Sequence, residues 1–147
     1  MSFGTHAYVP DPRNKDVLIN INGELIPREN AVVSVFDAGF MMGDGVWEGL
    51  RVHHGKVAFW KEHAARLKTG LMALDMDLGI SMETLHERIV ETLAANQMED
   101  GVHIRLMVTR GLKATPYQDP RVAIGPPTIV IAAEYKKADP KTAENAA

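Results

Sequence analysis

The 147-residue chain is 46% hydrophobic and 24% charged, and its formal net charge is −3. These values fit one globular domain with its own core, exclude a disordered chain, and leave no basic field that would hold a nucleic acid. Cysteine is absent, which excludes disulfides and thiolate metal sites and favours a cytoplasmic location, and no apolar run approaches the roughly 20 residues that span a membrane.

The N-terminal part of the chain predicts a β-hairpin. VLININGELIP, residues 17–27, contains two apolar runs joined at Asn22-Gly23. Both residues of such a tight turn need positive φ, which Asn and Gly adopt most easily. A further apolar, β-branched run follows at residues 31–36.

The next stretch is interrupted by three glycines, Gly39, Gly43 and Gly45. Residues 46–52 then alternate as a strand does. His54-Gly55 predicts a second tight turn, which leads the chain back into residues 56–59.

Two amphipathic helices are predicted after this turn. Apolar residues at i, i+4 and i+7 give the first helix one buried stripe, formed by Leu67, Leu71 and Leu74. For the second helix, Ser81 is a suitable N-cap, and Glu83 in the first turn favours the helix dipole. Its buried stripe consists of Leu85, Ile89 and Leu93.

Two strands complete the predicted fold. Residues 102–109 alternate, whereas residues 128–133 form a continuous apolar run, which is typical of a strand covered on both faces. Strands, two helices and then strands predict an α+β fold, with a mostly antiparallel sheet and both helices on one of its faces. The domain is expected to span residues 1–134, and the polar, aperiodic residues 135–147 are expected to begin an interdomain linker.

Three residues of the predicted strand 46–52 form a candidate ligand-binding surface. Alternation places Trp47, Gly49 and Arg51 on one side, and Gly49 leaves a hollow beside an aromatic ring and a fixed cation. Such a hollow could accept a planar or anionic ligand. The alternative is a tryptophan packed in the core, with the arginine extended to solvent.

Two further arginines stand in positions that are unusual for a solvated cation. Arg66 lies at the edge of the first helix's stripe, three residues after His63, where it could bind a phosphate or simply face solvent. Arg105 lies in the middle of a predicted strand, which is costly unless its face is open to a ligand or the arginine pairs with Glu48. Both explanations of Arg105 remain open at this point.

Other sequence signals are weaker. Thr109-Arg110-Gly111 ends a strand and leads into a loop that contains Tyr117, and such loops commonly contact ligands. The phosphate-loop and dinucleotide motifs are missing. The histidines show no H-E-x-x-H spacing, so no metal site is predicted.

The stretch DAGFMMGDGVWEGLRVHHGKVAFWKEHAARL resembles the N-terminal domain of the class IV (fold type IV) pyridoxal-phosphate aminotransferases. This family includes branched-chain and D-amino-acid aminotransferases, aminodeoxychorismate lyase and (R)-selective amine transaminases. The most specific parts of the resemblance are the segments GDGVWE and EHAARL together with their spacing. The likeness extends over nearly all of the chain.

The resemblance implies a role for each matching residue. Arg66 would hold the phosphate of pyridoxal 5'-phosphate. Trp47, where tyrosine or phenylalanine is more usual, would line the substrate pocket, together with Arg51 and Arg105. Tyr117 is a loose match to the loop that binds the substrate carboxylate in the D-amino-acid enzymes.

Some features depart from the family or lie outside the chain. Ala38 stands where arginine or histidine is frequent. The family's Schiff-base lysine belongs to a second domain, beyond residue 147, so no catalytic residue is assigned here and the chain alone is expected to be inactive. The resemblance implies amino acid and 2-oxo acid substrates and a homodimer or larger homo-oligomer. An aminodeoxychorismate lyase or a non-catalytic, self-associating domain are the alternatives.

Overall fold

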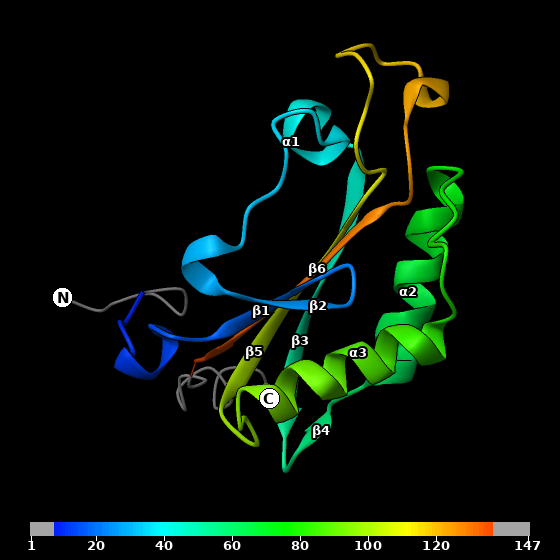
Figure 1. Cartoon of the computed structure of the whole chain (residues 1–147). Helices are drawn as coiled ribbons and strands as arrows, with labels where there is room; N and C mark the ends of the chain where they lie inside the picture. Colours follow the sequence, from blue (N-terminus) through cyan, green and yellow to red (C-terminus); the bar gives the residue numbers. More distant parts are fainter. Residues whose placement is uncertain (1–7, 137–147) are drawn as a thin grey trace, which may run out of the picture.

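The computed structural model describes residues 8–136 and contains one six-stranded sheet with the two long helices on one face (Figure 1). Every strand pair is antiparallel, and the strand order is β2-β1-β6-β5-β3-β4. The strands are β1 (Leu18–Ile21), β2 (Glu24–Pro27), β3 (Gly45–His53), β4 (Lys56–Val57), β5 (Val102–Thr109) and β6 (Thr128–Tyr135). The α-helices are α1 (Ala38–Met42), α2 (Trp60–Ala73) and α3 (Met82–Ala95), and three 3-10 turns cover Pro12–Asn14, Arg28–Asn30 and Pro120–Val122. The α+β prediction is confirmed.

The core lies between the sheet and the two long helices. Leucines and isoleucines of α2 and α3 pack against alternate residues of β3, β5 and β6, which are buried on this face only. Each such side chain stabilises the fold by about 1.5–3 kcal/mol when it is fully buried. The helix side chains in this core are Leu67, Leu71, Leu85, Ile89 and Leu93.

Local signals in the sequence explain several element ends. Ser81 caps α3, because its hydroxyl accepts a hydrogen bond from the Thr84 amide at 3.0 Å. Asn22 and Gly23 have φ of 52° and 92°, as the tight turn between β1 and β2 requires. Both features were predicted from the sequence.

The segment before β3 differs from the prediction. Residues 31–36 form no strand, and the short helix α1 stands where three glycines indicated only an interruption. Capping residues define where this helix begins and ends, and it has no apolar stripe that the sequence could have revealed. The Asp37 carboxylate accepts the Gly39 amide at 2.8 Å, and Gly43 ends the helix with φ of 67°.

The prediction that residues 128–133 are covered on both faces is wrong. Buried and partly exposed residues alternate along β6, with Ile129, Ile131 and Ala133 on the buried side. The apolar run is continuous although the helices cover one face only. The other face of the sheet is therefore open around its central strands.

The last strand reaches the first residue of the predicted linker. Tyr135, which the sequence placed at the start of the linker, is the last residue of β6, and the Arg13 guanidinium lies 3.8 Å from the centre of its ring. Residues 137–147 of the predicted linker lie outside the described residues. No helix within residues 8–136 has the length and apolar character needed to cross a bilayer.

Candidate functional site

The glycines of the Gly43-Asp44-Gly45 segment allow close packing at the start of β3. A Cβ atom on Gly45 would lie 2.6 Å from the Val108 carbonyl oxygen, so any larger residue would force β3 away from β5. Asp44 accepts a hydrogen bond from Arg110 Nε at 2.6 Å, and Arg110 Nη2 also donates to the Leu74 carbonyl at 2.7 Å. These contacts tie the beginning of β3 to the end of β5 and the end of α2.

Glu48 is a buried carboxylate that holds two side chains of α2. It is 2% exposed, and it accepts a hydrogen bond from Arg66 Nε at 2.8 Å and another from Arg66 Nη2. His63 Nδ1 lies 2.8 Å from the same carboxylate. The Arg66 guanidinium, and after it His63, hold the pKa of the Glu48 carboxyl below its usual value against the opposing effect of burial.

Arg66 is fixed in position yet open to solvent. Its side chain is 69% exposed although Glu48 binds one edge of the guanidinium. Among the described residues, no partner accepts a hydrogen bond from Nη1. Arg66 therefore presents oriented donors of fixed positive charge, which is the arrangement that binds a phosphate.

Trp47 and Arg105 form a second arrangement, on the open face of the sheet. The Arg105 guanidinium lies 3.9 Å from the centre of the Trp47 ring, in a cation–π contact. Trp47 is 61% exposed, so the alternative of a core tryptophan is wrong. Arg105 does not pair with Glu48 either, because that carboxylate lies on the opposite face of β3.

The hollow expected at Gly49 is partly filled. A Cβ atom at Gly49 would lie 3.3 Å from His103 Nε2 and 3.8 Å from the Trp47 ring. Arg51 is paired in register with His103, and Arg51 Nη1 donates a hydrogen bond to the Lys136 carbonyl. The open face thus carries a row of basic and aromatic groups rather than a simple hollow.

A cavity of about 270 Å³ adjoins this row. Arg28, Arg105 and Lys136 line it together with Glu134. The basic side chains outnumber the carboxylate, so the net charge of the lining is positive and favours an anion. Its other lining residues are Val17, Ile19, His103, Ala132 and Ala133.

His103 lies in a positive environment that disfavours its protonation. Burial, and then the nearby charges of Arg51, Lys136 and Arg105, lower the pKa of His103 from 6.5 to about 4. The ring is therefore neutral at pH 7 and can both donate and accept a hydrogen bond.

The depressed pKa predicts a pH-dependent stability. Between pH 6.5 and about 4, His103 takes up a proton in the unfolded chain but not in the folded protein. The free energy of unfolding should therefore fall by about 1–2 kcal/mol over this range, allowing for solvent screening of a half-buried ring. Urea unfolding at several pH values would measure this loss. The His103→Gln variant should lack this loss of stability. An identical pH dependence of unfolding in both proteins would show that His103 does not cause it.

The predicted site residues do not form one cluster. Trp47, Arg51 and Arg105 lie together on the open face, whereas Arg66 binds Glu48 on the helix-covered face. Within residues 8–136, no hydrogen bond or ring contact joins Tyr117, which is 68% exposed, to any of them. The two faces meet at the edge of β3.

This edge is largely unpaired. On one side β3 pairs with β5 from Gly45 to Val52, but on the other side it pairs with β4 only at Val52 and His53. Residues 45–50 thus present a free strand edge in the described part of the chain. A flat ligand at this edge would be within reach of side chains from both faces.

Sequence analysis missed two contributors to the site. Glu48 was considered only as a partner of Arg105, although strand alternation puts it on the same side as the buried Leu50. A carboxylate at such a position needs a cationic partner, which is a signal that could have indicated Arg66. His103 was assigned no role.

The chain is similar in sequence to proteins of one known family. Residues 45–146 match the family described as Amino-transferase class IV. The branched-chain-amino-acid aminotransferase-like protein 2 of Arabidopsis thaliana is 41% identical over 128 residues, which are 87% of this chain and 23% of that protein. The chain therefore spans less than a quarter of this relative's length.

Two solved structures have a similar fold. A branched-chain amino acid aminotransferase from T.th., solved with pyridoxamine 5'-phosphate, has a TM-score of 0.75 and 28% identity, over 86% of this chain and 42% of that chain. The 4-amino-4-deoxychorismate lyase of Pseudomonas aeruginosa has a TM-score of 0.68 and 26% identity, over 84% of this chain and 42% of that chain.

Proposed function

The chain belongs to the class IV amino-transferases, and from this membership we propose that it forms the N-terminal domain of a pyridoxal 5'-phosphate enzyme. The proposed reaction moves an amino group between an amino acid, or an amine, and a 2-oxo acid. The bound cofactor would supply the electron sink for this chemistry. The residues of this chain would bind and orient the cofactor and the substrate.

The observation that carries the proposal is the fixed, open guanidinium of Arg66. Glu48 orients it with two hydrogen bonds from a buried position, and the outward donors remain available for a phosphate. Because the donors are pre-oriented, little side-chain entropy is lost when the anion binds. The residues present therefore fit the cofactor's phosphate.

The free edge of β3 is the proposed location of the cofactor. A flat ring at residues 45–50 would have Arg66 on one side and Trp47 on the other. Trp47 would exclude water from one face of the pocket and give it an apolar wall. At this location the cofactor could contact both Arg66 and the Trp47–Arg105 pair, although these lie on opposite faces of the sheet.

Arg105 is the proposed partner of a substrate carboxylate. The Trp47 ring supports its guanidinium, and the adjoining cavity has a positive balance. Neutral His103 adds a hydrogen-bonding group without adding charge to that cavity. Arg51, on the same face, would strengthen the positive field, and the Tyr117 loop would approach the substrate from outside.

The Arg105→Leu variant should therefore select differently among substrates. In the intact enzyme we expect KM for acidic substrates to rise roughly 10- to 100-fold, because a hydrogen-bonded charge pair is lost. Cofactor content and KM for apolar substrates should change little. Steady-state kinetics with a dicarboxylic and an apolar 2-oxo acid would measure both effects. Lys61→Leu removes an exposed cation of α2 that the proposal assigns to neither cofactor nor substrate, and is the control; an unchanged KM in Arg105→Leu would make Arg105 structural.

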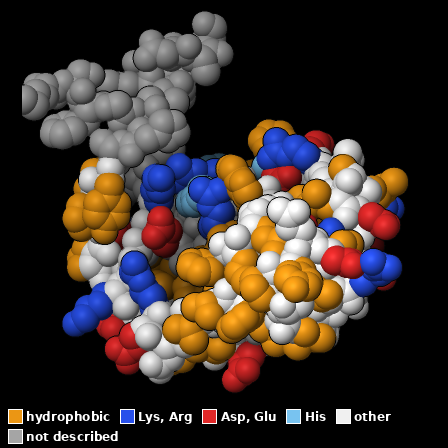
Figure 2. All heavy atoms as spheres, turned by 90° about the horizontal axis from the view of Figure 1, so that it is seen from above, with side chains coloured by type: hydrophobic (Ala, Val, Ile, Leu, Met, Phe, Trp, Pro, Cys, Tyr) orange, Lys and Arg blue, Asp and Glu red, His pale blue; other side chains and the backbone are white. Residues whose placement is uncertain are grey.

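A second domain is proposed to supply the Schiff-base lysine, and a second subunit to complete the enzyme. Several apolar side chains are exposed near α1 and on the loop between β5 and β6, and backbone hydrogen bonds hold these segments together. Figure 2 looks onto this end of the molecule and shows hydrophobic side chains across much of it. A homodimer or larger homo-oligomer would bury this surface, which consists of Val32, Val33, Val35, Phe36, Phe40, Leu112 and Ile124.

A lyase of the aminodeoxychorismate type is the second candidate, favoured by the similarity to the Pseudomonas aeruginosa enzyme. One assay separates the two functions. Incubation of the intact enzyme with an amino donor and a 2-oxo acid should yield a new amino acid if it is a transaminase. Pyruvate release from aminodeoxychorismate without an acceptor would indicate the lyase, and neither product would indicate a non-catalytic, self-associating domain.

A further inference from the structure

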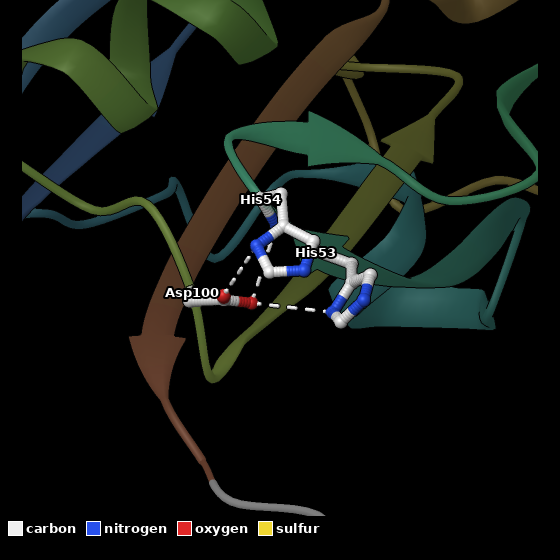
Figure 3. A group of neighbouring side chains, drawn as sticks. All are labelled: His53, His54 and Asp100. Carbon is white, nitrogen blue, oxygen red and sulfur yellow. Dashed lines mark hydrogen bonds and ion pairs between the residues drawn. The ribbon is translucent and has the colours of Figure 1, made fainter.

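Two histidines and one aspartate meet at the end of the sheet where β3 turns into β4 (Figure 3). His53 and His54 come from this turn, and Asp100 comes from the loop between α3 and β5. His53 Nδ1 lies 3.4 Å from one carboxylate oxygen of Asp100, and His54 Nδ1 lies 3.3 Å from the other. All three side chains are exposed.

The backbone holds these three residues in place. The His54 amide donates to the Asp100 carboxylate at 3.3 Å, and the Gly55 amide donates to the Glu99 carbonyl at 2.8 Å. His54 and Gly55 have φ of 48° and 73°, which fixes the tight turn.

The spacing of the ligand atoms suits a transition metal ion. One possible donor atom from each residue lies within 4.8 Å of the others. Two ligand atoms at about 2.0–2.1 Å from a tetrahedral Zn²⁺ ion are about 3.3 Å apart, which is close to the two nitrogen–oxygen distances in this cluster. Two imidazoles and one carboxylate favour Zn²⁺, Co²⁺ or Ni²⁺ over Mg²⁺ and Ca²⁺, which prefer oxygen ligands.

We propose that His53, His54 and Asp100 form a binding site for a divalent transition metal ion, with Zn²⁺ as the best fit. Water or another ligand would complete the coordination, because all three side chains are exposed. The bound ion would link the β3–β4 turn to the loop before β5. The site lies six residues beyond Trp47 along β3, roughly 20 Å at the rise of a strand, so it is separate from the proposed cofactor site.

The sequence predicted no metal site. His53 and His54 are adjacent and lack a recognisable metal-binding spacing, and Asp100 is 46 residues from His54. Only the fold brings the carboxylate to the turn. The proposal therefore depends on the tertiary structure and not on a motif.

Calorimetric titration of the full chain, free of any histidine tag, with Zn²⁺ would test the site. We expect saturable binding of one ion per chain, and no binding of Mg²⁺ at the same concentration. His53→Gln, His54→Asn and Asp100→Asn should each weaken Zn²⁺ binding at least about tenfold, since even residues that only support metal ligands have effects of this size. His86→Gln, which changes a histidine on α3, is the control and should bind Zn²⁺ as the wild type does.

Two further measurements keep the test decisive. Without metal, the three site variants should unfold at the same urea concentration as the wild type, and Zn²⁺ should raise the stability of the wild type and of His86→Gln but not of the site variants. If a variant fails to fold, the visible absorption of Co²⁺ bound to the wild type decides the question, because a tetrahedral site with imidazole ligands gives an intense spectrum. Absence of that spectrum, or equal Zn²⁺ affinity in folded variants and wild type, would overturn the proposal.

Discussion

Replacing Arg66 by alanine should weaken cofactor binding by the intact enzyme roughly 10- to 100-fold, because charge-assisted hydrogen bonds to the phosphate are lost. Pyridoxamine 5'-phosphate is the better probe, since it makes no covalent bond to a lysine and its affinity therefore reports the phosphate contacts directly. Fluorescence titration would give the dissociation constant. Substrate preference should change far less than cofactor affinity.

The control for this experiment is Lys61→Ala, which removes an exposed cation from the same helix. It should leave cofactor affinity close to that of the wild type. Glu48→Gln should give an intermediate loss, because Arg66 remains but its orienting carboxylate is gone. If Arg66→Ala binds the cofactor as tightly as Lys61→Ala does, Arg66 does not belong to the site.

The second large effect is expected at Arg110. Its side chain is 15% exposed, and its guanidinium binds the Asp44 carboxylate and the carbonyls of Leu74 and Asp75. In Arg110→Ala, Asp44 loses its cationic partner and the carbonyls lose a donor. The free energy of unfolding should fall by about 2–4 kcal/mol.

Urea denaturation would measure this loss, with Arg121→Ala as a matched control. Arg121 makes a similar two-point pair with Asp119, but its side chain is 89% exposed, so solvent screens the pair. The control should be hard to distinguish from the wild type. Equal stabilities of the Arg110 and Arg121 variants would show that the Arg110 contacts do not hold β3 to β5 and α2.

The sequence predicted the elements whose signals are local. The cap at Ser81, the Asn22-Gly23 turn and the alternation of Val102–Thr109 each depend on a few neighbouring residues, and the structure confirms them. Helix α1 was missed because its five residues carry no apolar stripe. The prediction that β6 is covered on both faces was wrong, because a continuous apolar run does not reveal which face lacks a helix.

The candidate site was less predictable, since its contacts join distant parts of the chain. The pair between Glu48 and Arg66 spans 18 residues, and the stacking of Arg105 on Trp47 depends on the pairing of β3 with β5. The resemblance to class IV aminotransferases indicated Arg66, Trp47 and Arg105. It did not indicate that Arg66 lies on the opposite face from the other two.

A crystal structure of the intact enzyme with bound pyridoxamine 5'-phosphate would test the central claim most directly. We predict that the Arg66 guanidinium keeps its hydrogen bonds to Glu48 and donates to the phosphate at about 2.7–2.9 Å, the usual length for such charged contacts. The cofactor ring should lie along the free edge of residues 45–50, with Trp47 at the substrate side. A phosphate bound elsewhere, with Arg66 facing solvent, would contradict the proposed site.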